Sequence, residues 1–125
     1  MTENEIATII VDAAYTIHKR LGPGLLESVY ETTLAYELEK RGPQMRRQQA
    51  MPVVYESVRM DIGFRADLIV ADKVIVEIKS VEAVSPVHRK PLLTYLRLTD
   101  KRLGLLINFN VELIRDGIAR VVNNL

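Results

Sequence analysis

Apolar residues recur with a helical period along the first forty residues of the chain. Five of them stand three or four positions apart near its start: Ile6, Ile10, Ala13, Ile17 and Leu21. This spacing predicts an amphipathic helix that ends at the glycine- and proline-rich segment 22–24. A second helix is expected over residues 25–41, because Gly42 and Pro43 follow it as a helix-ending pair.

The middle of the chain changes to β-branched and alternating residues. Strand-like runs cover residues 46–55, 58–70 and 74–81, and Gly63 predicts a break inside the second run. The short connections between these runs indicate a sheet built largely from hairpins.

The last third of the chain predicts one helix and one or two further strands. Residues 86–98 are typical of a helix whose start Pro91 leaves uncertain, since proline suits only a first turn. Residues 103–110 form a strongly apolar core strand, and residues 111–122 are expected to add a short hairpin or an edge strand. This order predicts one α+β (mixed α/β) domain over residues 1–125, with a single central mixed β-sheet flanked by helices.

Two carboxylates and an ammonium group interrupt the apolar runs around residue 70. Burying a charge without a partner is costly, so charges that persist in such strands usually pair, hold a metal or take part in chemistry. If Val70 pairs with Val74 across a short turn, Asp67 lies opposite Glu77. Lys79 shares that face because side chains two apart on a strand point the same way. The opposite face carries residues that suit a core: Leu68, Val70, Val74, Val76 and Ile78.

Composition excludes several classes of protein. The 125 residues include no cysteine, so disulfides and thiolate metal sites are excluded, and the net charge of +1 does not by itself indicate nucleic acid. No apolar run approaches the roughly 20 residues of a membrane span, and the polar start is unlike a signal peptide. The expected location is therefore the cytoplasm, with no membrane partner. A homo-oligomer is left open.

Basic residues outnumber acidic ones after the predicted hairpin. Candidate nucleic-acid contacts in and around this region are Arg65, Arg89, Lys90 and Arg97. An ordinary solvated helix face explains the same residues equally well.

The start of the second helix carries a further set of polar residues. Glu27 and Tyr30 are three positions apart and share a helical face. Taken alone, Glu27 is explained by the helix dipole and Tyr30 by packing with a hydrogen-bonded hydroxyl. His18 is explained by the C-terminus of its own helix or a neighbouring side chain, with a metal or catalytic role as the less favoured alternative.

Taken together, these segments resemble the GxxExxY proteins, a family assigned to the PD-(D/E)XK nuclease superfamily. The matching residues run through nearly the whole chain: Gly24–Tyr30, Gln48, Pro52, Tyr55, Arg65–Leu68, Glu77–Lys79, Tyr95–Arg97 and Gly104–Asn110. The resemblance implies a restriction-endonuclease-like core, in which a helix precedes a sheet interrupted by a crossover helix.

The resemblance also implies a reaction. Nucleases of this superfamily hold magnesium with the aspartate and the glutamate of Glu-x-Lys. Carried over, Asp67, Glu77 and the backbone carbonyl of Ile78 become ligands of Mg²⁺ or Mn²⁺, and Lys79 positions the attacking water. Glu27 enters from the helix as an additional acidic group. The expected function is hydrolysis of a phosphodiester in DNA or RNA by metal-activated water.

One position departs from the pattern of the related nucleases. Their helix after Glu-x-Lys commonly brings a glutamine to the active site, with a tyrosine four residues later. Here Tyr95 stands at the tyrosine position, but Pro91 stands where glutamine is expected. The alternative function is therefore a weak or inactive nuclease fold that binds nucleic acid or a protein, and a third reading is a plain cross-strand charge network.

Overall fold

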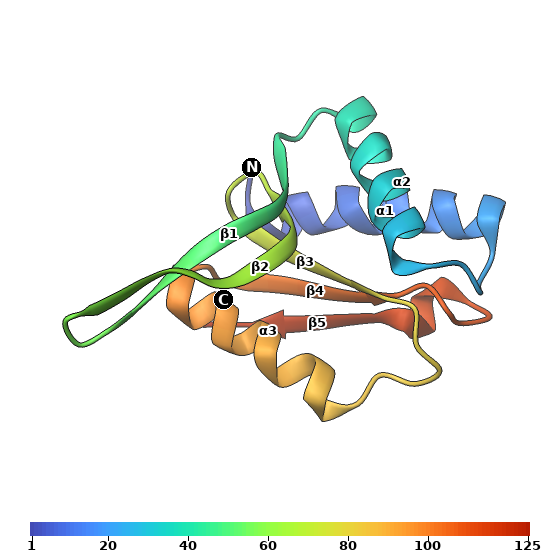
Figure 1. The fold of residues 1–125 in the computed structure, drawn as a ribbon. Helices are drawn as coiled ribbons and strands as arrows, with labels where there is room; N and C mark the ends of the chain where they lie inside the picture. Colours follow the sequence, from blue (N-terminus) through green and yellow to red (C-terminus); the bar gives the residue numbers. More distant parts are fainter.

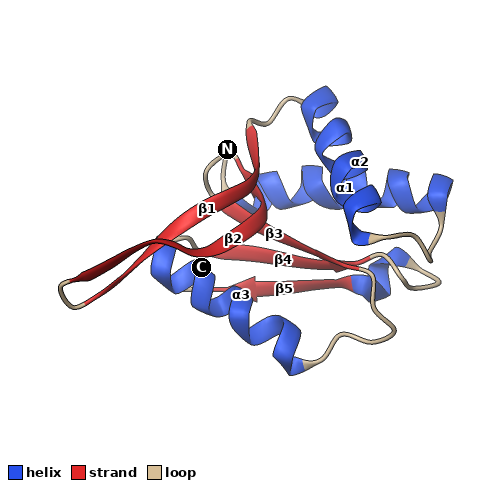
Figure 2. Ribbon diagram, viewed as in Figure 1, coloured by secondary structure: helices blue, strands red, loops and turns tan.

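The computed structural model describes residues 1–125 as one five-stranded mixed sheet with helices on both faces (Figures 1 and 2). Its strands lie in chain order: β1 (Met45–Tyr55), β2 (Val58–Val70), β3 (Val74–Lys79), β4 (Leu103–Asn108) and β5 (Ile118–Val122). All neighbouring strands are antiparallel except β3 and β4, which are parallel. This architecture confirms the predicted α+β class with a central mixed sheet.

Three α-helices and one 3₁₀ turn surround the sheet. The helices are α1 (Glu3–Leu21), α2 (Glu27–Arg41) and α3 (Pro86–Thr99), and η1 (Ile114–Gly117) precedes β5. Helix α3 is the crossover that joins the parallel strands β3 and β4, as parallel strands require. None of the three helices is both long and apolar enough to cross a membrane.

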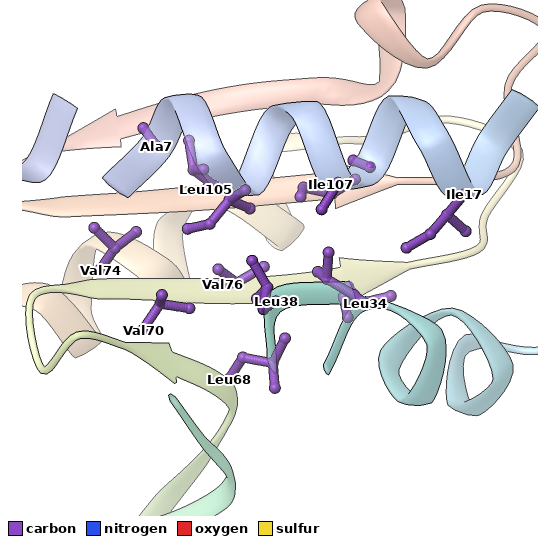
Figure 3. Packing of buried hydrophobic residues seen from close by; sticks show 14 of the residues in the cluster. Ala7, Ile17, Leu34, Leu38, Leu68, Val70, Val74, Val76, Leu105 and Ile107 are labelled. Atoms are coloured by element: carbon purple, nitrogen blue, oxygen red, sulfur yellow. The ribbon is translucent and has the colours of Figure 1, made fainter. Parts of the chain in front are cut away.

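The main core lies between the sheet and the α1–α2 layer (Figure 3). Twenty buried residues form it, including every residue of the predicted core face of the hairpin. A second cluster of six buried residues lies on the opposite face, where Leu92 and Leu96 of α3 pack on Ile69 and Ile75. Each face of the sheet therefore has its own apolar layer.

The β2–β3 hairpin has the predicted register. Leu68 pairs with Val76, Ile69 with Ile75 and Val70 with Val74. Ala71 and Asp72 adopt left-handed φ values of 52° and 56° and build the turn. The ladder ends at Leu68, and β2 continues with β1 as its only partner. Glu77 and Lys79 therefore pair with β4 alone.

Side-chain contacts explain three corrections to the predicted boundaries. Helix α2 begins at Glu27 rather than Leu25, because Leu26 is extended and the Leu25 N–H donates to the Tyr30 hydroxyl. Strand β3 ends at Lys79 rather than Val81, since Ser80 and Val81 bond to side chains instead of to a strand. The last core strand ends at Asn108 rather than Asn110, because the Asn110 N–H turns to the Asn108 side chain.

The second strand is continuous through Gly63, so the expected break is wrong. The irregularity falls instead in the pairing, where the register shifts between Met51 and Val53. A Cβ at Gly63 would lie 2.0 Å from Val53 Cγ2, so glycine makes room for the valine.

Pro91 lies well inside α3, and the helix starts at Pro86. The Ser85 N–H donates to His88 Nδ1 at 3.0 Å and helps to fix that start. The segment after β4 supplies a 3₁₀ turn and the edge strand β5, not a separate hairpin.

Candidate active site

Asp67 and Glu77 meet where β2 leaves β3. The Ile78 N–H donates to Asp67 Oδ2 at 2.8 Å, and the Asp67 N–H donates to Glu77 Oε1 at 3.4 Å. Each carboxylate is therefore held by the backbone of the other strand. Glu77 lies two residues from Ile75 of the α3-side cluster, so strand alternation turns it toward the face covered by α3. Asp67 lies between Ala66 of that cluster and Leu68 of the larger cluster, at the place where β2 leaves β3.

Glu77 is half-buried beside a second carboxylate. Burial, followed by the charge of Asp67, raises the pKa of Glu77 to about 8. The positive charge of Lys79 acts in the opposite direction and favours the ionised form. Two carboxylates share this site with one ammonium group, so ionising both of them leaves a negative charge that a further cation would neutralise.

The backbone of β3 offers another oxygen at the same place. The Phe109 N–H donates to the Lys79 carbonyl at 3.0 Å, so residue 79 bonds toward β4. The Ile78 N–H, in contrast, donates to Asp67 on the β2 side of β3. The N–H and C=O of one strand residue point toward the same neighbouring strand. The Ile78 carbonyl thus faces the side from which β2 has bent away.

Glu27 reaches the end of β3 from the other layer. Ser80 N–H donates to Glu27 Oε2 at 3.1 Å, and Ser80 Oγ donates to the Leu25 carbonyl at 2.7 Å. These two bonds join the start of α2 to the residue that follows Lys79. Glu27 itself is exposed.

Tyr30 holds the loop that presents Glu27. Its hydroxyl donates to the Gly22 carbonyl at 2.6 Å and accepts the Leu25 N–H at 3.1 Å. The ring is fully buried and stacks on Phe109 with 4.4 Å between ring centroids. Gly24 has a φ of +100°, a conformation that favours glycine. The segment from Gly24 to Tyr30 is thus a local device that positions one carboxylate, and Tyr30 is its structural anchor.

Gln48 is a neighbour of the carboxylates to which sequence reasoning assigned no role. Its Nε2 donates to Asp67 Oδ1 at 3.2 Å and also to the Glu31 carboxylate. Arg47 pairs with the same Glu31 at 3.0 Å. Adjacent strand residues normally point to opposite faces, but a φ of +48° at Gln48 turns both side chains toward α2. Only its place among the residues of the family resemblance signalled it in the sequence.

Asn108 fixes the chain beyond Lys79. Its Oδ1 accepts the N–H groups of Val81 and Asn110, and its Nδ2 donates to the Val81 carbonyl at 2.9 Å. The side chain is almost completely buried. Asn108 therefore ties the exit of β3 to the end of β4.

Tyr95 approaches the carboxylates from α3. Its ring stacks on Phe64 with 4.0 Å between centroids. Burial raises the pKa of the Tyr95 hydroxyl, and the charges of Glu77 and Asp67 add to the shift. Pro91 lies four residues earlier on the same helical face and supplies neither an amide side chain nor a backbone donor.

The remaining predicted residues occupy other places. His18 is buried with its Nε2 at 2.8 Å from the Val111 carbonyl, and it borders a groove of about 660 Å³ formed by the end of α1 and the η1 region. Arg89, Lys90 and Arg97 are exposed on α3. Arg65 is exposed on β2, with its guanidinium 3.5 Å from the Gln48 carbonyl. Thus His18 is held by a structural hydrogen bond, whereas the four basic residues have free surface around them.

The donor set fits a hard divalent cation. Asp67 and Glu77 supply carboxylate oxygens with free lone pairs, and the Ile78 carbonyl faces the same side. No group of three or more His, Asp or Glu side chains in the chain is arranged to hold a metal. Magnesium commonly keeps several waters and needs only one or two carboxylates. The residues present are therefore sufficient for such an ion.

The comparison with protein families assigns the chain to a class of hydrolases. Residues 4–121 match the family model described as the PD-(D/E)XK nuclease superfamily, and the chain belongs to that superfamily. No curated protein and no solved structure matches it. Members of this superfamily are nucleases that generally use divalent metals.

Proposed function

We propose that this protein is a divalent-metal-dependent nuclease that hydrolyses phosphodiesters in DNA or RNA. The observation that carries the proposal is the Asp67–Glu77 pair beside Lys79, with the pKa of Glu77 raised to about 8 by burial and by Asp67. A divalent cation would stabilise the ionised form of both adjacent carboxylates, and we therefore expect it to be their partner.

Each residue of the site has a separate role in this proposal. Asp67, Glu77 and the Ile78 carbonyl would hold Mg²⁺ or Mn²⁺, which lowers the pKa of a bound water and neutralises charge on phosphate oxygens. Lys79 keeps a positive charge beside the attacking water. Glu27, fixed by the Ser80 N–H, accepts a hydrogen bond from water at the end of β3. Tyr95 borders the site from α3.

The same geometry supports the finer family assignment. We infer that the chain is one of the GxxExxY proteins within the superfamily, because Gly24, Glu27 and Tyr30 act as one structural unit. Gly24 allows the loop, Tyr30 holds it, and Glu27 is presented to the end of β3. Nucleic-acid contacts by Arg65, Arg89, Lys90 and Arg97 form part of this proposal.

A second candidate function rests on Pro91. The helix that borders the site has no amide at this position, so the chain could bind metal and nucleic acid with little cleavage. Metal binding and cleavage must therefore be measured separately.

The test is calorimetry with Mn²⁺ and Mg²⁺ together with cleavage assays on a panel of DNA and RNA substrates. The wild-type protein is expected to bind the metal and to cleave only in its presence. Glu77→Ala should lose both properties. Glu82→Ala is the matched control, because Glu82 is an exposed glutamate five residues away. Cleavage that persists in chelator or in Glu77→Ala would refute the proposal, and metal binding without cleavage would favour the binding module.

A further inference from the structure

Strands β1 and β2 extend beyond the rest of the sheet as a two-stranded arm, residues 51–64 (Figure 1). Tyr55 pairs with Val58 across the tip, and only these two strands pair along the arm. At its base Phe64 stacks on Tyr95 of α3. An isolated two-stranded hairpin is only marginally stable in water, so an arm of this length is expected to have a partner.

The tip of the arm presents an apolar face. Val53 pairs with Met60 and Tyr55 with Val58, so these four side chains lie together on one face, which we call the tip cluster. Tyr55 is 70% exposed, Val58 56% and Met60 40%. On the other face Val54, 58% exposed, pairs with Arg59. The arm thus exposes large apolar side chains far from either core.

The charges and the backbone of the arm limit which kind of partner it can bind. The arm carries one basic and two acidic side chains, and Arg59 and Asp61 already pair at 3.1 Å. Such an arm lacks the positive charge that phosphate backbones require. Pro52 lies in the edge strand β1 and has no N–H to donate, which disfavours edge-to-edge strand addition. The mode of binding that remains is packing of the apolar face of the arm against an apolar surface of a protein.

We propose that the occupant is a second copy of this chain, with the two tip clusters packed face to face across a two-fold axis. In a two-fold contact the same patch serves both subunits, so an apolar face meets an identical face without opposed like charges. The tip cluster exposes roughly 350 Å² of side-chain surface on one arm, which is in the size range of the largest apolar patches on monomeric proteins, patches that often serve in binding. Two tip clusters together bury about 700 Å², below the roughly 1,000 Å² of a stable specific interface, so we expect a weak dimer.

Sedimentation velocity on the 125-residue chain between about 1 and 200 μM tests this proposal. The wild-type protein is expected to show a concentration-dependent monomer–dimer equilibrium. The double variant Tyr55→Thr/Val58→Thr keeps residues that favour strands and should raise the dimer dissociation constant at least tenfold. Val122→Thr is the matched control, because Val122 is 46% exposed on the opposite edge strand, and it should leave the constant unchanged. Circular dichroism establishes that each variant is folded.

Cross-linking locates the interface. The chain has no cysteine, so Tyr55→Cys introduces a single thiol near the proposed axis and Val122→Cys introduces one far from it. Under mild oxidation Tyr55→Cys should form a disulfide-linked dimer much faster than Val122→Cys. A protein that stays monomeric throughout the concentration range overturns the proposal, as does a dimer unaffected by the double variant. Loss of affinity for labelled nucleic acid in the double variant, with no dimer in the wild type, would instead assign the arm to nucleic acid. These readouts do not depend on nuclease activity.

Discussion

The two faces of the sheet differ in what they bury. The α1–α2 face covers twenty buried residues in one apolar cluster, whereas the α3 face covers six and also carries Glu77 and Lys79, with Asp67 at the edge where β2 leaves β3. Side chains alternate along β3, so Ile78 belongs to the first face and its neighbours on either side to the second. One strand therefore serves stability with alternate residues and chemistry with the others.

The difference shows how a small domain can tolerate a costly site. Burial and the charge of Asp67 raise the pKa of Glu77, so ionising Glu77 opposes folding, and that cost must be offset by other contacts. The larger cluster lies directly across the sheet, and the Tyr30–Phe109 stack adds to it. Stability and chemistry are thus separated by one layer of backbone, so substitutions of adjacent residues should have different consequences.

The largest expected effect is on catalysis at Lys79. Lys79→Ala should lower metal-dependent cleavage roughly 100-fold or more, because it removes a charge placed beside the attacking water. Mn²⁺ affinity measured by calorimetry should stay within a few-fold of wild type, since lysine is not a ligand. The matched control is Lys19→Ala, at the groove near His18, which should leave cleavage unchanged. Equal losses of metal affinity and cleavage would instead make Lys79 part of the binding site.

The adjacent residue should affect folding. Ile78→Ala is expected to lower the free energy of unfolding by about 2–5 kcal/mol, because Ile78 is buried in the larger cluster. Ile78→Val, which removes one methylene, should cost about 0.5–1.5 kcal/mol. Urea unfolding measures both values. A loss in Ile78→Ala no larger than in Ile78→Val would show that the faces do not differ as proposed.

The acidic pair should make stability depend on pH. The pKa of Glu77 is about 8 in the folded protein against 4.5 in the unfolded chain, so the folded state holds an extra proton between these values. The contribution of Glu77 to the free energy of unfolding is therefore lost as the pH rises from about 4.5 to about 8. The free energy of unfolding of Glu77→Gln should equal that of the wild type near pH 5 and exceed it by about 1–3 kcal/mol near pH 9. This range is reduced because Glu77 is partly exposed to solvent. Urea unfolding at both pH values checks this, and Mn²⁺ should stabilise only the wild type. A constant difference between the two proteins would contradict the shifted pKa.

Much of this arrangement could be predicted from the sequence because it depends on period and register. The β-branched runs around a short turn specified the pairing of Val70 with Val74, and this register brought Asp67 to Glu77. Glu27 was expected through the family resemblance alone. Gln48 received no role because its contacts depend on a left-handed backbone at a residue other than glycine, which breaks strand alternation. The hydrogen bonds of Tyr30 and Asn108 likewise could not be predicted from the periodicity of the sequence, since they join side chains to the backbone of loops.

A smaller effect is expected at Gln48, which holds Asp67 from outside the carboxylate pair. Gln48→Leu should weaken Mn²⁺ binding about tenfold, because Gln48 donates to the metal ligand Asp67. This loss of affinity is at the low end for residues that orient metal ligands, since Gln48 is exposed. Gln49→Leu is the matched control, since the Gln49 amide bonds only to the Ala50 carbonyl. Calorimetry measures both affinities. Equal affinities in the two variants would limit Gln48 to a structural role.

The smallest effect on the site is expected at Pro91. Pro91→Gln should raise metal-dependent cleavage about threefold, because an amide four residues before Tyr95 lies on the same face of α3 and can donate to phosphate or ordered water. Since Pro91 is inside the helix, the substitution also restores a backbone donor, and the melting temperature should equal or exceed that of the wild type. Adding Glu77→Ala must abolish the gain, because the new amide can assist only a site that still holds metal. A stable Pro91→Gln protein that cleaves no faster on the full substrate panel would show that the missing glutamine does not limit this site, and the α3 face would then be better explained as a binding surface.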